Sequence, residues 1–154
     1  MGLVAQRLAA LGLAIPRVVA PLAAYLPAVR HGDLVMTAGQ LPMREGSLVA
    51  VGIVGRDVSV EAAEAAARLC ALNAIAAIAS VADLDEVAQV IKVTGFVASA
   101  PDFTAQPAVV NGASNLLLAA FGEAGRHARS AVGVAVLPLN APVEVEVTVI
   151  LRSS

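Results

Sequence analysis

The sequence contains few charged and few aromatic residues. Only 14% of its 154 residues are charged and 3% are aromatic, with no tryptophan and a single tyrosine. Apolar residues make up 58% and the mean hydropathy is +0.81, whereas a soluble domain ordinarily carries about 25% charged residues. Such a chain either enters a membrane or has much of its surface covered by another molecule.

No apolar run is long enough to span a membrane, which takes about 20 consecutive apolar residues. The longest weakly polar run, 69–82, is interrupted by Asn73 and Ser80. Near the N-terminus, Pro16 and Arg17 end a short apolar run that only loosely resembles a signal peptide, and an amphipathic helix over 3–13 explains the same residues. We therefore expect no membrane association and instead expect oligomerisation, because obligate subunit interfaces are apolar.

Several function classes lack their usual residues. The net charge is −2 and there is no basic run, so nucleic-acid binding is not expected. One cysteine, Cys70, and two histidines cannot form a structural zinc site, and we expect no metal or organic cofactor. A single cysteine also excludes an intrachain disulfide, which suits the cytoplasm; we expect it to be a packing residue. Standard catalytic signatures are absent.

Glycine and proline divide the chain into strand and helix segments of one domain, 1–154, with an N-terminal helical extension over about 1–20. In 143–152, valines alternate with polar residues, which specifies the register of a strand. The order predicts an α/β fold in two layers, with a mixed sheet covered on one face by two helices and on the other by neighbouring subunits. The expected strands are 26–30, 34–38, 47–54, 86–99, 130–136 and 143–152, and the expected long helices are 60–79 and 107–121.

Two charged residues stand inside apolar sequence. Arg129 immediately precedes the strand 130–136, and Glu144 begins the strand 143–152. A guanidinium binds a carboxylate ligand with two parallel hydrogen bonds, and a nearby carboxylate can orient water or move a proton. An ordinary Arg129–Glu144 ion pair, or two unrelated surface residues, would explain the same pattern. His31 and His127 are interpreted as solvated loop residues.

Three blocks of sequence occur in the order found in one known family. Residues 125–146 read GRHARSAVGVAVLPLNAPVEVE, residues 32–42 read GDLVMTAGQLP, and 96–103 precede Val110-Asn111. Together they cover roughly 20–152 and closely resemble the RidA/YjgF family (endoribonuclease L-PSP-like, reactive intermediate deaminase). The longer N-terminus resembles a divergent branch of it.

The resemblance implies a chorismate-mutase-like subunit in a homotrimeric barrel, with ligand pockets in the clefts between subunits. Family members with the full site deaminate small enamines and imines derived from amino acids, such as 2-aminoacrylate, without a cofactor. By the same resemblance, Arg129 would clamp the substrate carboxylate, Glu144 would position the hydrolytic water, and Gly39 and Ala131 would offer backbone N–H groups. Tyr25 would close over the ligand.

Asn111 matches the family's pocket asparagine, but other positions depart from the family pattern. Ala38 replaces a serine or threonine, Ala131 replaces a frequent cysteine, and Gly133 replaces an acidic residue. We therefore keep three hypotheses: an enamine/imine deaminase, a non-catalytic trimeric protein that binds small carboxylates, and, less favoured, a ribonuclease.

Overall fold

The computed structural model describes residues 1–18, 21 and 23–153, so the end of the expected N-terminal extension lies outside the described residues. The helices are α1 (Leu3–Ala10), α2 (Val60–Ala79) and α3 (Gln106–Phe121), with short 3₁₀ helices η1 (Leu84–Glu86), η2 (Gly122–Gly125) and η3 (Pro138–Asn140). The strands are β1 (Ala28–His31), β2 (Leu34–Thr37), β3 (Met43–Arg44), β4 (Ser47–Leu48), β5 (Val87–Ala98), β6 (Ala128–Val134) and β7 (Val143–Leu151).

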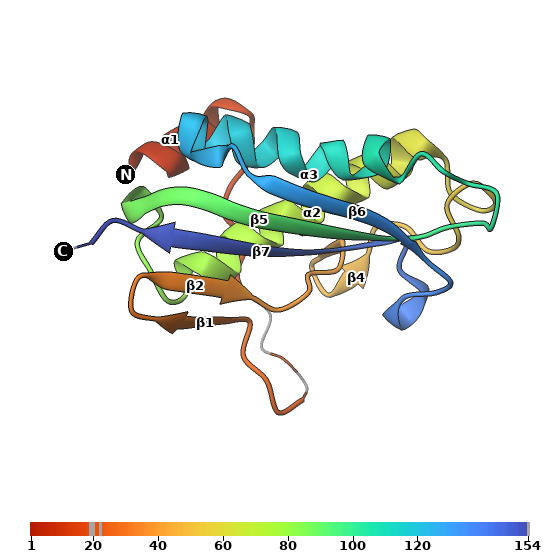
Figure 1. Cartoon of the computed structure of the whole chain (residues 1–154), viewed down its shortest axis with the longest axis horizontal. Helices are drawn as coiled ribbons and strands as arrows, with labels where there is room; N and C mark the ends of the chain where they lie inside the picture. The colour runs from red at the N-terminus through yellow and green to blue at the C-terminus, as the bar shows by residue number, and fades with distance from the viewer. Residues whose placement is uncertain (19–20, 22, 154) are drawn as a thin grey trace.

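Five strands form one mixed sheet in the order β1-β2-β7-β5-β6 (Figure 1). Strands β5 and β6 are parallel, and the other neighbours are antiparallel. Parallel neighbours require a crossover connection, which α3 supplies. Helices α2 and α3 pack on each other and on one face of the sheet. The predicted two-layer α/β architecture is confirmed.

The core lies between this sheet and α2 and α3. In β7, Val143, Val145 and the alternate residues after them are buried, as the alternation predicts. Alanine dominates the buried face of α2, and Gly112 of α3 meets the Glu64 carbonyl of α2 so closely that a Cβ would overlap it. Small residues bring the two helices together, which explains how a core with few aromatics is filled.

Helix α2 is long and apolar enough to pass for a membrane span by length and composition. However, 67% of its most apolar window is buried inside the fold. Its hydropathy is therefore accounted for by its central place between α3 and the sheet.

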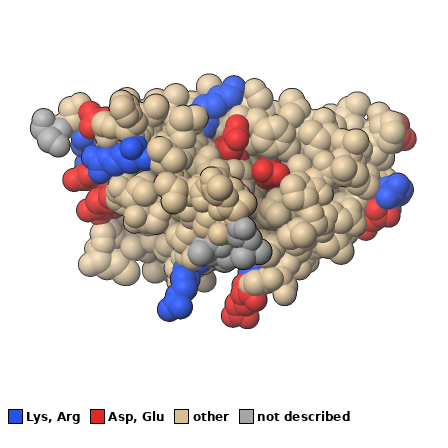
Figure 2. Space-filling view, turned by 90° about the horizontal axis from the view of Figure 1, so that it is seen from below, with Lys and Arg blue, Asp and Glu red and all other residues tan. Residues whose placement is uncertain are grey.

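The face of the sheet opposite α2 and α3 is open and partly apolar. Met36 of β2 is 53% exposed and Val29 of β1 is 55% exposed, and the two residues pair with each other on this face. Figure 2 shows how sparse charged side chains are on the surface seen from below. Exposed apolar groups that share a face mark interaction surfaces. We call the face of the sheet opposite α2 and α3 the open face. Its exposed apolar side chains include Val29, Leu34, Met36, Val132 and Ile150.

Three sequence-based boundaries were wrong. The strand expected at 47–54 is reduced to β4, which pairs only with β3, because Gly52 takes a positive φ of +116° and the Ile53 N–H turns to the Asp57 carboxylate. The N-terminal helix ends at Ala10 rather than residue 13, since Gly12 adopts φ +72°. Strand β6 begins at Ala128, so residue 129 lies inside the strand and not before it.

Helix α1 is attached through Asp85, which follows α2 in sequence by several residues. The Leu3 and Val4 N–H groups donate to the two carboxylate oxygens of Asp85 at 2.8 and 2.9 Å, in place of a local cap. These bonds hold the pKa of Asp85 below its usual value. Further along α1, Arg7 donates to the Ala120 carbonyl at the end of α3. The Asp85 contact therefore holds the start of α1 against η1, and the Arg7 contact holds α1 against the end of α3.

Replacing Asp85 with alanine is expected to loosen α1. Its first N–H groups would lose their acceptor, so amide hydrogen exchange in 3–10 should accelerate and the melting temperature should fall. Because the pKa of Asp85 is lowered in the fold, its stabilisation is present above the usual carboxyl pKa and is lost as the pH falls through the lowered value. Asp102→Ala, in an exposed turn, is the control; equal exchange in both variants would contradict this account.

Candidate functional site

Arg129 lies on β6, at one edge of the sheet, and its side chain points toward α3. The Nη1 group donates to Asn111 Oδ1 at 2.8 Å and to Ser114 Oγ at 3.2 Å, and Nη2 donates to the Pro107 carbonyl at 3.4 Å. All three acceptors belong to α3. The structure therefore brings Arg129 and Asn111 together, as the resemblance implied.

These bonds leave one side of the guanidinium available. A guanidinium has five N–H donors, and the bonds to α3 use both on Nη1 and one on Nη2. Among the described residues, the Nε–H and the second Nη2–H have no acceptor. These two donors are adjacent and parallel, which is the arrangement that a carboxylate accepts. Arg129 is thus fixed on one side by the protein and open to a planar anion on the other.

Backbone donors lie next to Arg129 at the free edge of β6. The Ser99 N–H donates to the Val134 carbonyl. The backbone N–H and C=O groups of Val134, and of residues 132 and 130 before it, therefore face β5. By alternation, the backbone groups of Ala131 and Gly133 point away from the sheet. Among the described strands, the Ala131 N–H therefore has no ladder acceptor, and it can donate to an anion beside Arg129.

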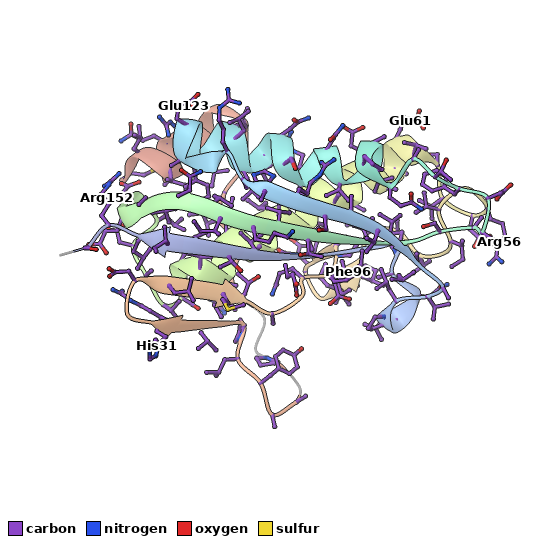
Figure 3. The ribbon with its side chains drawn as sticks, in the orientation of Figure 1. His31, Arg56, Glu61, Phe96, Glu123 and Arg152 are labelled. Carbon is purple, nitrogen blue, oxygen red and sulfur yellow. The ribbon has the colours of Figure 1, made fainter. Side chains whose placement is uncertain are left out.

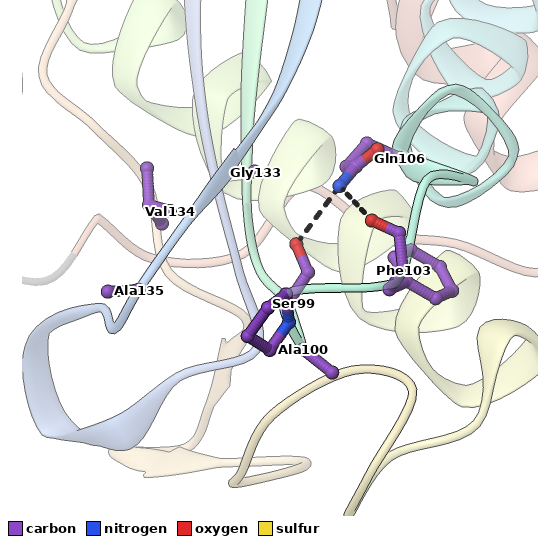
Figure 4. Close-up of a pocket in the computed structure, with 8 residues that line it drawn as sticks. Ser99, Ala100, Phe103, Gln106, Gly133, Val134 and Ala135 are labelled. Carbon is purple, nitrogen blue, oxygen red and sulfur yellow. Dashed lines mark hydrogen bonds between the residues drawn. The ribbon is translucent and has the colours of Figure 1, made fainter.

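A pocket of about 280 Å³ continues along this edge beyond Arg129 (Figure 4). In its wall, Gln106 Nε2 donates to the Phe103 carbonyl at 2.8 Å and to Ser99 Oγ at 3.3 Å. A Cβ on Gly133 would stand only 2.8 Å from Gln106 Nε2. Glycine at 133 thus makes room for the Gln106 amide, which explains one departure from the family pattern.

Glu144 belongs to a second group of residues, on the open face. Its β5 neighbour is Phe96 (Figure 3). Met36 pairs with Thr148 of β7, and Gln40, just after β2, pairs with Val145. The segment from Met36 to Gln40 therefore has one residue more than the β7 segment opposite it, which is a β-bulge. The bulge brings Gly39 against Glu144 so closely that a Cβ would overlap the carboxylate.

The bulge also frees a backbone donor. The Ala38 N–H donates to the Pro27 carbonyl and the Gln40 N–H to the Val145 carbonyl. Among the described residues, the Gly39 N–H between them has no acceptor. One N–H donor and one carboxylate, of residues 39 and 144, therefore lie side by side on the open face.

The surroundings of Glu144 disfavour the charged form of its carboxyl group. Burial raises its pKa, and the negative charge of Glu146 on the same face raises it further. A carboxyl group whose pKa is moved toward neutrality can both accept and return a proton. A raised pKa makes the Glu144 carboxylate a stronger proton acceptor than an exposed glutamate.

Tyr25 lies far from Arg129 in the same chain. It is 56% exposed in the bend that precedes β1, at the edge of the sheet opposite β6. Four strand spacings separate β1 from β6, or about 19 Å. Tyr25 cannot close over a ligand bound to Arg129 of its own chain.

Arg129 and Glu144 lie on opposite faces of the sheet. Arg129 pairs with Val93, whose side chain is buried under the helices, whereas Glu144 pairs with Phe96 on the open face. Within one chain they do not form the ion pair that the sequence left open as an alternative. We refer to the two groups below as the arginine half-site (Arg129, Asn111, Ala131) and the glutamate half-site (Glu144, Gly39).

Sequence reasoning missed two polar residues beside Arg129. His127 was interpreted as a solvated loop residue, but it is partly buried, with Nε2 2.9 Å from Ser114 Oγ and Nδ1 2.6 Å from the Gly125 carbonyl oxygen. Ser114 itself was not noticed. The only signal was that Ser114 follows Asn111 by one helical turn and that His127 precedes Arg129 by two residues on a strand.

Cys70 is buried in α2, where burial raises the pKa of its thiol well above the usual value, and Sγ donates to the Val143 carbonyl at 3.7 Å. Its expected packing role is confirmed. Within the described ranges, no three His, Cys, Asp or Glu side chains gather as metal ligands do.

Comparison with known proteins places this geometry in a family. Residues 5–150 match the family model described as "YjgF/chorismate mutase-like, putative endoribonuclease". The chain belongs to this YjgF family. Protein TCP17 of Trypanosoma cruzi is 44% identical over 154 residues, covering 99% of this chain and 96% of TCP17.

Solved structures agree with this assignment and confirm the expected chorismate-mutase-like fold. Protein Atu1372 of Agrobacterium tumefaciens, of unknown function, is 46% identical with a TM-score of 0.90, covering 97% of this chain and 94% of that one. TdcF of Escherichia coli, crystallised with bound serine, is 26% identical with a TM-score of 0.65, covering 89% and 94%. The chain therefore belongs to a branch of the YjgF family that is more similar to Atu1372 than to TdcF.

Glu144→Gln is expected to raise stability at neutral pH. Because the fold raises the pKa of Glu144, the native state holds its proton more tightly than the unfolded state. Stability therefore falls as the pH rises from the usual carboxyl pKa through the raised one. Denaturant unfolding between pH 4 and 8 should show this loss in the wild type and a smaller one in Glu144→Gln. Glu45→Gln, in the exposed β3–β4 turn, should behave as the wild type; if Glu144→Gln does too, the assignment is wrong.

Proposed function

We propose that the protein binds small carboxylates in a pocket that forms only where the arginine half-site of one copy meets the glutamate half-site of another. The observation that carries this proposal is the guanidinium of Arg129, which α3 holds on one side while two adjacent donors stay unused. A carboxylate would occupy those donors, and backbone N–H groups of Ala131 and of the other copy's Gly39 would complete an anion site.

A homotrimer is the assembly that we propose for joining the half-sites. The open face carries exposed apolar side chains on four strands, from Val29 on β1 to Val132 on β6. A neighbouring copy packed on this face would bury them and would bring its own β6 edge toward Glu144. The scarcity of charge in the sequence supports the same arrangement, because obligate interfaces are apolar.

The reaction that we propose is hydrolysis of a small 2-amino-acid-derived enamine or imine. Arg129 holds the carboxylate. The enamine takes a proton on its terminal carbon and gives up one N–H proton, which makes the imine. Glu144 then takes a proton from water as the oxygen adds to the C=N carbon and passes this proton to the nitrogen, which gives a carbinolamine. The hydroxyl proton of the carbinolamine moves through Glu144 to the nitrogen as the C–N bond breaks and the C=O bond forms, so ammonia leaves with a 2-oxo acid as product. The raised pKa of Glu144 supports this role.

The serine bound to TdcF supports the choice of ligand class. Serine carries one carboxylate on a carbon that also bears nitrogen, as do 2-amino-acid-derived enamines.

A second candidate function is binding without catalysis. Ala38, Ala131 and Gly133 offer no side-chain hydroxyl, thiol or carboxylate, yet the backbone donors and Arg129 persist. A trimeric sensor of small carboxylates needs no more than these. Ribonuclease activity is less favoured, because the face seen in Figure 2 shows no basic patch and the chain has a net charge of −2.

Arg129→Ala is expected to weaken binding of 2-oxobutyrate by about 10- to 100-fold, because charge-assisted hydrogen bonds are lost. Arg129→Lys should recover little, since an ammonium cannot make the paired contact. Calorimetry measures binding, and ammonia release from 2-aminoacrylate measures turnover. Arg126→Ala, which removes a neighbouring exposed arginine, should leave both unchanged. Equal binding by Arg129→Ala would overturn the proposal, and binding without turnover in the wild type would favour the sensor.

Mixing two inactive variants tests whether the half-sites belong to different copies. Arg129→Ala and Glu144→Gln proteins are each expected to lack turnover. After joint unfolding and reassembly, some interfaces combine an intact arginine with an intact glutamate, so about one quarter of the wild-type activity should return if copies mix randomly in a cyclic assembly. Reassembly of each variant alone is the control. No recovery from mixed assemblies shown to contain both variants would place the whole site in one copy.

A further inference from the structure

We propose that His127 and Ser114 act as positioning residues for Arg129, holding its guanidinium so that the Nε–Nη2 side faces the ligand. This inference rests on the proposed carboxylate site and adds the means by which its arginine is oriented. Neither residue would touch the ligand in this arrangement, because both lie on the protein's side of the guanidinium.

The three side chains form one continuous row of hydrogen bonds. Arg129 Nη1 lies 3.2 Å from Ser114 Oγ, Ser114 Oγ lies 2.9 Å from His127 Nε2, and His127 Nδ1 lies 2.6 Å from the Gly125 carbonyl oxygen. All three side chains are partly buried. The row runs from the backbone at the end of α3, across α3 itself, to β6.

The chemistry of the groups sets the direction of each bond. A guanidinium can only donate, so Ser114 Oγ accepts from Arg129. The Ser114 hydroxyl hydrogen is then free to donate to His127 Nε2. The Gly125 carbonyl can only accept, so His127 carries its proton on Nδ1. Each donor in the row has an acceptor when His127 is neutral with this tautomer.

The far end of the row is rigid. Gly125 is buried, and a Cβ there would overlap the Leu117 carbonyl, so the backbone packs directly against α3. A fixed carbonyl sets the plane of the His127 ring, and the ring sets the Ser114 hydroxyl. The network therefore occupies Nη1 permanently and prevents the guanidinium from turning its Nη1 edge to the ligand.

Two substitutions at 127 separate the role of the ring nitrogen from mere packing. A glutamine amide oxygen can reach the position of Nε2 and still accept from Ser114. An asparagine is shorter and reaches only the position of Nδ1. We expect His127→Asn and Ser114→Ala each to weaken 2-oxobutyrate binding about 3- to 10-fold, the effect of a lost neutral hydrogen bond. His127→Gln should retain most of the affinity, with unchanged melting temperature in all three variants.

The double variant His127→Asn/Ser114→Ala tests whether the residues act as one unit. Side chains in one hydrogen-bonded row lose little more together than singly. The double variant should therefore bind within about 1.5-fold of the weaker-binding single variant. Loss equal to the product of the two single effects, or equal affinity for His127→Asn and His127→Gln, would overturn the proposal.

The tautomer gives a measurement that does not depend on any ligand. Nitrogen-15 NMR of the ligand-free protein should show His127 protonated at Nδ1 and unprotonated at Nε2 at pH 8. His31→Gln identifies the signals, because the chain has two histidines and His31 lies at the β1–β2 turn, away from β6 (Figure 3). Protonation at Nε2 instead would refute the row. If the tautomer is as stated but the wild type binds no 2-oxo acid, the proposed function fails while the positioning of Arg129 stands.

Discussion

The alternation of side chains across a β-sheet controls where chemistry can occur in this protein. Arg129 on β6 faces the helices because its partner Val93 does, and Glu144 on β7 faces the opposite side because its partner is Phe96. No rotamer change moves either side chain through the sheet. A site that uses both the Arg129 guanidinium and the Glu144 carboxylate therefore needs two copies of the chain, and under the proposed function assembly would be a condition for activity.

The same constraint makes sense of the composition. A single chain leaves one face of its sheet uncovered, with apolar side chains such as Met36 and Ile150 exposed. In the proposed trimer, neighbouring copies would remove this face from water and would bring the two half-sites together. Small residues also shape the interior, since Gly112 lets α2 and α3 approach closely. Stability and site formation would then depend on the same contacts between copies.

Much of the fold could be predicted from sequence, but little of the site's geometry could. The alternating valines of 143–151 determine which face is buried, and Ser59 and Gly122 mark the start of α2 and the end of α3 as capping rules predict. The strand expected at 47–54 failed because Gly52 and Asp57 form a turn that periodicity does not reveal. The family motifs identified Arg129 and Glu144 as candidate site residues. Their placement on opposite faces of the sheet, however, depends on strand pairing between distant segments. The contacts of Ser114 and His127 with each other and with Arg129 could not be predicted for the same reason.

The most direct test is a crystal structure of the assembled protein soaked with 2-oxobutyrate. The account predicts one ligand molecule at each boundary between copies, with its carboxylate on the Nε–Nη2 side of Arg129 from one copy and the Gly39 N–H and Glu144 of the next copy within hydrogen-bond distance. A monomeric protein, or a ligand bound by Arg129 with no residue of a second copy nearby, would contradict it.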